Sequence, residues 1–172
     1  MGTAALVIAI LSLVIAVFSL GWQVAAWLLE TGRVRVKLQH GVVGWNGIVV
    51  GDVHRDGRPR DLAPLRSQGA EGPEILAIKV TNVGRSHVTV TRYGTRAPKS
   101  KNELVPVADV MGPSLPHRLE PGESETWWMN MDGVRALVHA SKVLAPRERR
   151  VDMFVETGLG RTLYTSRRIV IK

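Results

Sequence analysis

Histidine is the residue type in this sequence best suited to acid–base or metal chemistry, because the chain has five histidines and no cysteine. His54 lies between Asp52 and Asp56, which permits a carboxylate–histidine pair, although a loop histidine beside acids is more often a simple surface residue. No two histidines stand at a spacing typical of metal ligands on one element, and there is no HExxH motif. The five positions are His40, His54, His87, His117 and His139.

Other catalytic and cofactor motifs are incomplete in this chain. Asp56 and Asp61 lack the spacing and the final glutamate of a calcium-binding EF-hand loop. The Gly158–Gly160 segment lacks the third glycine of a dinucleotide-binding turn, and no GxSxG or phosphate-binding loop is present. Ser114 and Ser124 have no recognisable catalytic partners. We therefore expect no catalysis, no cofactor and no metal, and an enzyme built on the His54 loop is kept only as a minor alternative.

Positive charge is the clearest candidate for a binding function. The formal net charge is +8, and every charged side chain lies at or after Glu30. Clustered arginines bind phosphates or acidic proteins, whereas solvated loop charge is the alternative interpretation. One basic group follows the apolar segment directly and consists of Arg33, Arg35 and Lys37. The second is a candidate anion or partner patch made of Arg147, Arg149, Arg150, Arg167 and Arg168.

The first basic group follows an uncharged run from Ala4 to Leu29. As an α-helix this run is about 39 Å long, and a bilayer core is about 30 Å thick. Its polar residues are limited to Ser12, Ser19 and Gln23, too few for the polar face of a buried helix in a small protein. The run predicts a transmembrane helix as an anchor over 1–30, followed by one domain over 31–172.

Charge also predicts the orientation of this helix. The first three residues carry no basic side chain, whereas Arg33, Arg35 and Lys37 follow the helix. Basic residues beside a span stay on the cytoplasmic side, so we expect a single-pass protein of the cell membrane with its N-terminus outside and its domain in the cytoplasm. The alternative is a cleaved signal peptide or an exported domain, since Val24–Ala26 is a weak small-residue cleavage site.

Small and weakly polar residues form a stripe along the helix at alternating spacings of four and three. Such a stripe lets two helices approach closely in lipid, with serine and glutamine bonding across the interface. We expect this face to pack against a helix of a protein partner or of a second copy, although such stripes also arise by chance. Its members are Ala5, Ala9, Ser12, Ala16, Ser19 and Gln23.

The remainder of the chain reads as short strands separated by turns. Period-two alternation, β-branched residues and turn signals predict these elements. A long loop is expected over 54–73, and a basic loop over 95–102. The 75–82 and 87–93 segments form the clearest strand pair, joined by 83–86. Adjacent Trp127 and Trp128 must point to opposite faces of their strand. Strands are expected over 33–40, on both sides of a turn at Asn46-Gly47, and over 75–82, 87–93, 103–110, 124–131, 150–156 and 162–171, with one short helix over 133–141 capped by Asp132.

These elements predict a mainly β fold: an N-terminal transmembrane α-helix followed by an antiparallel immunoglobulin-like β-sandwich with one short helix between late strands. The segments Val80–Gly84, Val88–Val90 and Leu119–Glu123 read VxNxG, VxV and LxPGE. This combination resembles immunoglobulin-like adhesion or accessory domains. With the N-terminal helix, the chain resembles uncharacterised single-pass membrane proteins of actinobacteria and their phages. The resemblance implies the fold and brings no activity with it.

The sequence therefore predicts a membrane-tethered binding or assembly module that engages a protein partner or its own copy. The alternative is a membrane-bound binder of anionic lipid or nucleic acid that acts through its arginine clusters. Nucleic acid ranks behind the other partners, because little in the sequence suggests groove reading or base stacking.

Overall fold

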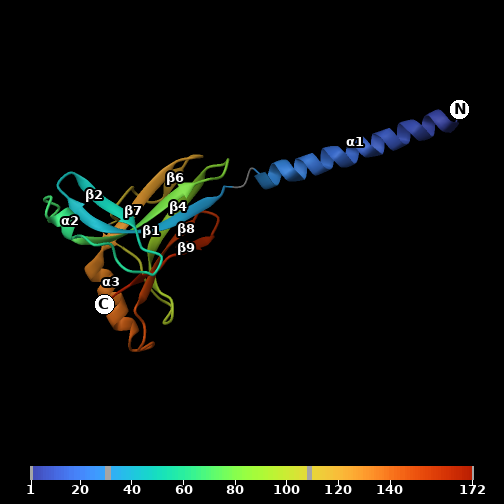
Figure 1. Cartoon of the computed structure of the whole chain (residues 1–172). Helices are drawn as coiled ribbons and strands as arrows, with labels where there is room; N and C mark the ends of the chain where they lie inside the picture. The colour runs from blue at the N-terminus through green and yellow to red at the C-terminus, as the bar shows by residue number, and fades with distance from the viewer. Residues whose placement is uncertain (1, 30–31, 108–109, 172) are drawn as a thin grey trace.

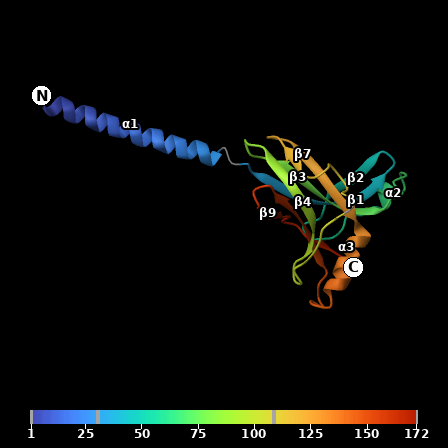
Figure 2. The same cartoon turned by 180° about the vertical axis from the view of Figure 1, so that it is seen from behind.

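The computed structural model describes residues 2–29, 32–107 and 110–171, and it shows a mainly β protein preceded by one long helix (Figure 1). Helix α1 (Gly2–Leu29) projects away from the β domain in both views (Figures 1 and 2). Its 6–24 side chains are exposed, and Leu6–Ala26 is long and apolar enough to cross a membrane. The boundary expected at residues 30–31 falls on residues outside the described ranges.

The first antiparallel sheet has the order β2-β1-β3-β7. Its strands are β1 (Val34–Gly44), β2 (Gly47–Asp52), β3 (Glu74–Asn82) and β7 (Ser124–Asn130). The β1–β2 turn is confirmed, but it consists of Trp45 and Asn46, one residue earlier than expected. Gly47 already pairs with Gly44 in the ladder.

The second sheet is built on a long central pair, β4 (Val88–Ala97) and β8 (Arg150–Thr157), which run antiparallel. Each outer edge of this pair carries two short strands. Along β4 lie β6 (His117–Leu119) and β5 (Asn102–Leu104); along β8 lie β9 (Thr162–Tyr164) and β10 (Ile169–Val170).

The structure differs from two predictions about strands and loops. The 75–82 and 87–93 segments are strands, but they do not pair, because β3 lies in the first sheet and β4 in the second. Buried Asn82 stabilises the segment in which the chain passes from the first sheet to the second. Its side-chain amide donates to the Ser86 and Leu119 carbonyls, and its oxygen accepts from the Gly84 N–H. The expected basic loop over 95–102 is a hairpin, because β4 continues to Ala97 and β5 begins at Asn102.

Two expected strands are shorter than their patterns suggested. The 103–110 strand ends at Leu104 in β5, on an edge of the sheet, and its 108–109 positions lie outside the described residues. The last strand is divided into β9 and β10 by buried Thr165. Its hydroxyl accepts from the Met153 N–H and donates to the Arg167 carbonyl, which turns the chain between the two short strands.

The two helices of the β domain are α2 (Ala63–Arg66) and α3 (Met131–Ser141). Helix α3 begins earlier than expected, and its cap is Asn130, whose side-chain oxygen accepts the Asp132 N–H at 2.9 Å. Asp132, the predicted cap, lies in the first turn and pairs with Arg135. A carboxylate in the first turn interacts favourably with the positive end of the helix dipole and so stabilises the helix.

Side chains from both sheets and from α3 form the core. Trp127 is 0% exposed, and its indole N–H donates to the Pro113 carbonyl at 2.9 Å. The Tyr93 hydroxyl donates to the Trp128 carbonyl at 2.9 Å, so a polar atom enters the core with a partner. Trp128 is half-buried on the opposite face of β7, which confirms the expected alternation.

Candidate binding surface opposite the helix

The β domain has two ends, and the strand directions identify them. Strand β1 begins at Val34, close in sequence to α1, and β4 begins beside it at Val88. The ten residues of β4 then carry the chain about 30 Å, at roughly 3.3 Å per residue, to Ala97. Strand β8 starts at that far end with Arg150, near α3 (Figure 1).

Five basic residues meet around one open cleft of ≈ 460 Å³ at this far end. Four of them belong to the predicted patch, and the fifth, Lys99, comes from the β4–β5 turn. Lys99 belongs to the predicted basic loop over 95–102 but not to the predicted patch. Its link to the 147–150 segment arises only because β4 pairs with β8. This group, named the distal basic cluster, consists of Lys99, Arg147, Arg149, Arg150 and Arg168.

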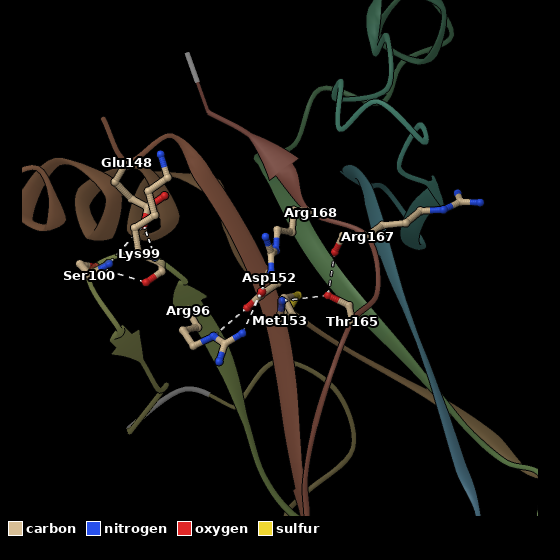
Figure 3. Close-up of polar contacts among 10 residues, drawn as sticks. Arg96, Lys99, Ser100, Glu148, Asp152, Met153, Thr165, Arg167 and Arg168 are labelled. Carbon is tan, nitrogen blue, oxygen red and sulfur yellow. Dashed lines mark hydrogen bonds and ion pairs between the residues drawn. The ribbon is translucent and has the colours of Figure 1, made fainter. Parts of the chain in front are cut away.

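A buried carboxylate holds the distal basic cluster in place. Glu148 is 0% exposed, and its Oε2 accepts the Lys99 N–H at 2.6 Å and the Ser100 N–H at 3.3 Å (Figure 3). Its Oε1 accepts the Arg150 N–H at 3.3 Å. The charge of Glu148 thus faces backbone N–H groups of the β4–β5 turn and of β8, and fixes the two segments against each other.

A second buried acid, Asp152, binds two arginines below the cluster (Figure 3). Arg96 donates to both of its carboxylate oxygens, at 3.1 and 3.0 Å, and Arg168 donates to one of them at 3.3 Å. The hydrogen bonds to Asp152 raise the pKa of Arg96, and the guanidinium also stacks 3.6 Å from the centre of the Tyr164 ring. Arg96 and Arg168 are therefore held by an internal partner.

The other cations of the cluster have no such partner. Lys99, Arg147, Arg149 and Arg150 are all exposed, and within the described ranges none of them forms an ion pair with a carboxylate. Among the described residues, their side chains form one hydrogen bond, which Lys99 Nζ donates to the Arg147 carbonyl at 3.3 Å. Four charges thus remain available to a ligand.

A second cleft continues the basic surface. Its lining includes four arginines and one acid, and consists of Arg55, Asp56, Gly57, Arg150, Ser166, Arg167 and Arg168. Arg167 is half-buried and donates to the Val53 carbonyl at 2.6 Å, which ties it to the first sheet. The predicted patch is therefore divided, with Arg167 outside the cleft of the distal basic cluster.

The structure does not bring together the carboxylate–histidine pair considered at His54. His54 is exposed, and its neighbours are occupied elsewhere: Asp52 accepts from Gln39 at 3.2 Å, and Asp56 pairs with Arg58 at 3.0 Å. Among the described residues, neither acid forms a hydrogen bond with the His54 side chain.

The expected long loop over 54–73 is ordered by contacts that sequence analysis missed. Buried His40 accepts the Arg60 N–H on Nδ1 at 3.1 Å, so its Nε2 donates to Glu74 at 2.7 Å. Burial raises the pKa of Glu74, but hydrogen bonds from His40 and Arg135 outweigh burial, and the net shift of the pKa is downward. These contacts tie the loop to β1, β3 and α3.

The predicted basic group beside the helix is exposed. Arg33 directly precedes β1, and Arg35 and Lys37 alternate with half-buried Val34 and Val36 along the strand, as the period-two pattern predicted. Arg35 and Lys37 share a shallow cleft with Arg167.

The stripe on α1 has no partner among the described parts of the chain, since Ala9, Ser12, Ala16, Ser19 and Gln23 are all exposed. Gln23 donates to Ser19 at 3.4 Å, one turn away. The Ala5 side chain lies outside the described residues.

Comparison with protein-family models and with curated proteins gives no match.

Proposed function

We propose that the chain is a membrane-tethered binding module that presents the distal basic cluster to an acidic segment of a protein partner. In this proposal α1 is a single transmembrane anchor, and the β domain is an immunoglobulin-like sandwich without catalytic function. The supporting observation is that Glu148 and Asp152 are buried in internal contacts, while four cations around the cleft have no carboxylate partner within the described ranges. Unpaired, closely spaced cations attract a polyanionic surface.

The position of the distal basic cluster within the domain favours a protein as its ligand over the lipid of the anchoring bilayer. The cluster lies about 30 Å along β4 from the end that adjoins α1, whereas electrostatic attraction to lipid is screened within about 10 Å. Arg33 and Arg35 at the near end are better placed for lipid headgroups. Nucleic acid is the weaker candidate, because none of the described residues that line the cleft is an aromatic side chain able to stack with a base.

The proposed orientation places the N-terminus outside the cell membrane and the domain in the cytoplasm. It rests on the exposed basic residues Arg33, Arg35 and Lys37 after the helix. A pair of reporters fused after Lys172, one active only outside the membrane and one only inside, tests this orientation. A signal from the outside reporter would instead favour an exported domain, and loss of residues 1–26 from the mature protein would identify a signal sequence.

Charge reversal tests the binding function. The full chain is placed in nanodiscs of neutral lipid, and a labelled poly-glutamate peptide and a single-stranded RNA are titrated by fluorescence anisotropy. We expect Arg149→Glu with Arg150→Glu to weaken peptide binding at least tenfold, because charge-assisted contacts contribute about 1.5–3 kcal/mol each. The control is Arg66→Glu with Arg85→Glu, which makes the same change in net charge at exposed arginines away from the cleft.

The control decides how a loss of binding is interpreted. An equal loss in both double variants would mean that net charge alone attracts the peptide, which would contradict a specific surface. Tighter binding of RNA than of peptide, lost in the Arg149/Arg150 variant and falling steeply with salt, would support the nucleic-acid alternative.

The stripe on α1 supports a second contact of this module, between two copies in the membrane. The exposed Ala9, Ala16 and Ser19 offer the small side chains that let helices pack closely in lipid. Self-association would join two distal basic clusters in one assembly and raise the effective affinity for a multivalent partner.

A further inference from the structure

One histidine and two glutamates meet at the end of the β domain that adjoins α1. A nitrogen of His117 and one carboxylate oxygen each of Glu123 and Glu125 lie within 4.8 Å of one another. All three residues are half-buried.

The topology explains how they meet. His117 belongs to β6, which pairs with β4 in the second sheet, and Glu125 belongs to β7, which pairs with β3 in the first sheet. Because side chains alternate along a strand, His117 faces the same side as buried Leu119, and Glu125 the same side as buried Trp127. Both therefore point between the sheets.

Glu123 is brought in by the turn that joins β6 to β7. Gly122 at φ +83° and the Glu123 N–H bond to the Glu120 carbonyl at 3.0 Å form the expected Pro121-Gly122 turn. One Glu123 oxygen accepts the Glu120 N–H at 2.7 Å, which holds this carboxylate beside the gap.

The polar groups at this site lack a positive partner. His117 Nε2 is buried and makes no hydrogen bond, while the imidazole ring packs edge-on against Trp127 at 5.8 Å. Within the described ranges neither Glu123 nor Glu125 forms an ion pair, and the neighbouring Arg118 pairs with Glu120 at 2.7 Å. A cation between the three side chains would satisfy the imidazole and reduce the repulsion between the carboxylates.

We propose that His117, Glu123 and Glu125 bind a Zn²⁺ ion that links β6 to β7. One imidazole and two carboxylates suit zinc, whereas Ca²⁺ takes six to eight oxygens and Mg²⁺ prefers oxygen ligands and water. At Zn–ligand distances of about 2.0–2.2 Å, tetrahedral ligands lie roughly 3.4 Å apart. The three side chains, now within 4.8 Å of one another, therefore close by up to about 1.4 Å when the ion binds, and water completes the fourth position.

This ion clamps the two sheets together at the end where the chain enters from α1. The site is separate from the distal basic cluster at the opposite end of β4, and it holds whether or not that cluster binds a protein. We expect Zn²⁺ to stabilise the folded domain, because the ligands are assembled only when β6 and β7 are in their native positions.

Spectroscopic replacement of zinc by cobalt tests the site in the full chain in detergent micelles. The protein is treated with a chelator and titrated with Co²⁺, whose visible absorption bands report tetrahedral coordination. Zn²⁺ is then added in competition to measure its Kd. We expect Glu125→Gln and His117→Gln each to abolish the cobalt spectrum and to weaken Zn²⁺ binding at least about tenfold. The matched controls are Glu120→Gln and His87→Gln, which change two exposed residues at the same end of the domain. Both controls should retain the cobalt spectrum and the Zn²⁺ affinity of the wild type.

Thermal unfolding gives an independent measurement. At a free Zn²⁺ concentration of 100 times the wild-type Kd, the Tm of the wild-type chain and of both controls rises by about 8 °C, and that of Glu125→Gln rises by about half as much or less. Glu125→Gln preserves side-chain shape, so it decides the matter if His117→Gln does not fold. The proposal is overturned if Glu125→Gln binds Co²⁺ and Zn²⁺ as the wild type does, or if the wild type shows neither spectrum nor shift.

Discussion

Replacing Glu148 by glutamine tests whether the buried carboxylate builds the distal basic cluster. The carboxylate accepts three backbone N–H groups, two on Oε2 and one on Oε1. Glutamine has one acceptor oxygen, so it keeps either the Lys99 and Ser100 bonds or the Arg150 bond, and its NH₂ group faces the remaining donors. Each bond to a charged group contributes about 1.5–3 kcal/mol. Loss of one or two of them therefore lowers the free energy of unfolding by about 3 kcal/mol.

Urea unfolding of the full chain in micelles, followed by circular dichroism, measures this loss. The control Glu71→Gln removes the same charge from an exposed side chain and should change the unfolding free energy by less than about 0.5 kcal/mol. Peptide binding is measured on the same samples. Unchanged stability, with or without a loss of binding, would refute the conclusion that Glu148 holds the β4–β5 turn against β8.

Three further predictions concern other elements. The lowered pKa of Glu74 means that its contribution to stability is complete above about pH 4.5 and is lost as the pH falls through the folded pKa. Urea midpoints between pH 6 and 3 should therefore fall more steeply for the wild type than for Glu74→Gln, and parallel curves would contradict the shift. Asn130→Ala should destabilise the domain by about 1 kcal/mol in the same assay. Asp132→Ala should cost less, and the reverse order would mean that the cap is misassigned. Ala16→Leu should reduce cross-linking of the full chain in lipid, whereas Leu13→Ala, off the stripe, should not; equal cross-linking in both would argue against a helix dimer through this face.

Local patterns in the sequence predicted local structure well. The alternation of Val34, Val36 and Leu38 with charged residues predicted β1, because a strand that is buried on one face needs apolar residues at every second position. Pro121-Gly122 predicted its turn, because the turn requires a positive φ that glycine adopts without strain. Neighbouring Trp127 and Trp128 were assigned to opposite faces by the same alternation. In each case, residues close in the sequence contain the whole physical cause.

Predictions failed where the answer depended on a distant partner. The strand patterns of β3 and β4 are correct, but alternation reports only that one face is buried and does not identify the neighbouring strand. The cap of α3 was placed two residues late, because aspartate and asparagine both cap helices and the choice follows from where β7 ends.

By itself, the sequence determined that the chain has one apolar helix long enough to span a bilayer, a mainly β domain and an excess of positive charge. Net charge and hydropathy are sums over residue types, and helix and strand patterns repeat over a few neighbouring residues. Only the tertiary structure decided which charges are free, because it pairs β4 with β8 and thereby places Lys99 beside Arg147 and Asp152 beneath Arg168. It also brought His117 to Glu125 across two sheets. Such sites depend on strand pairing between residues far apart in the sequence, and no local spacing encodes that pairing.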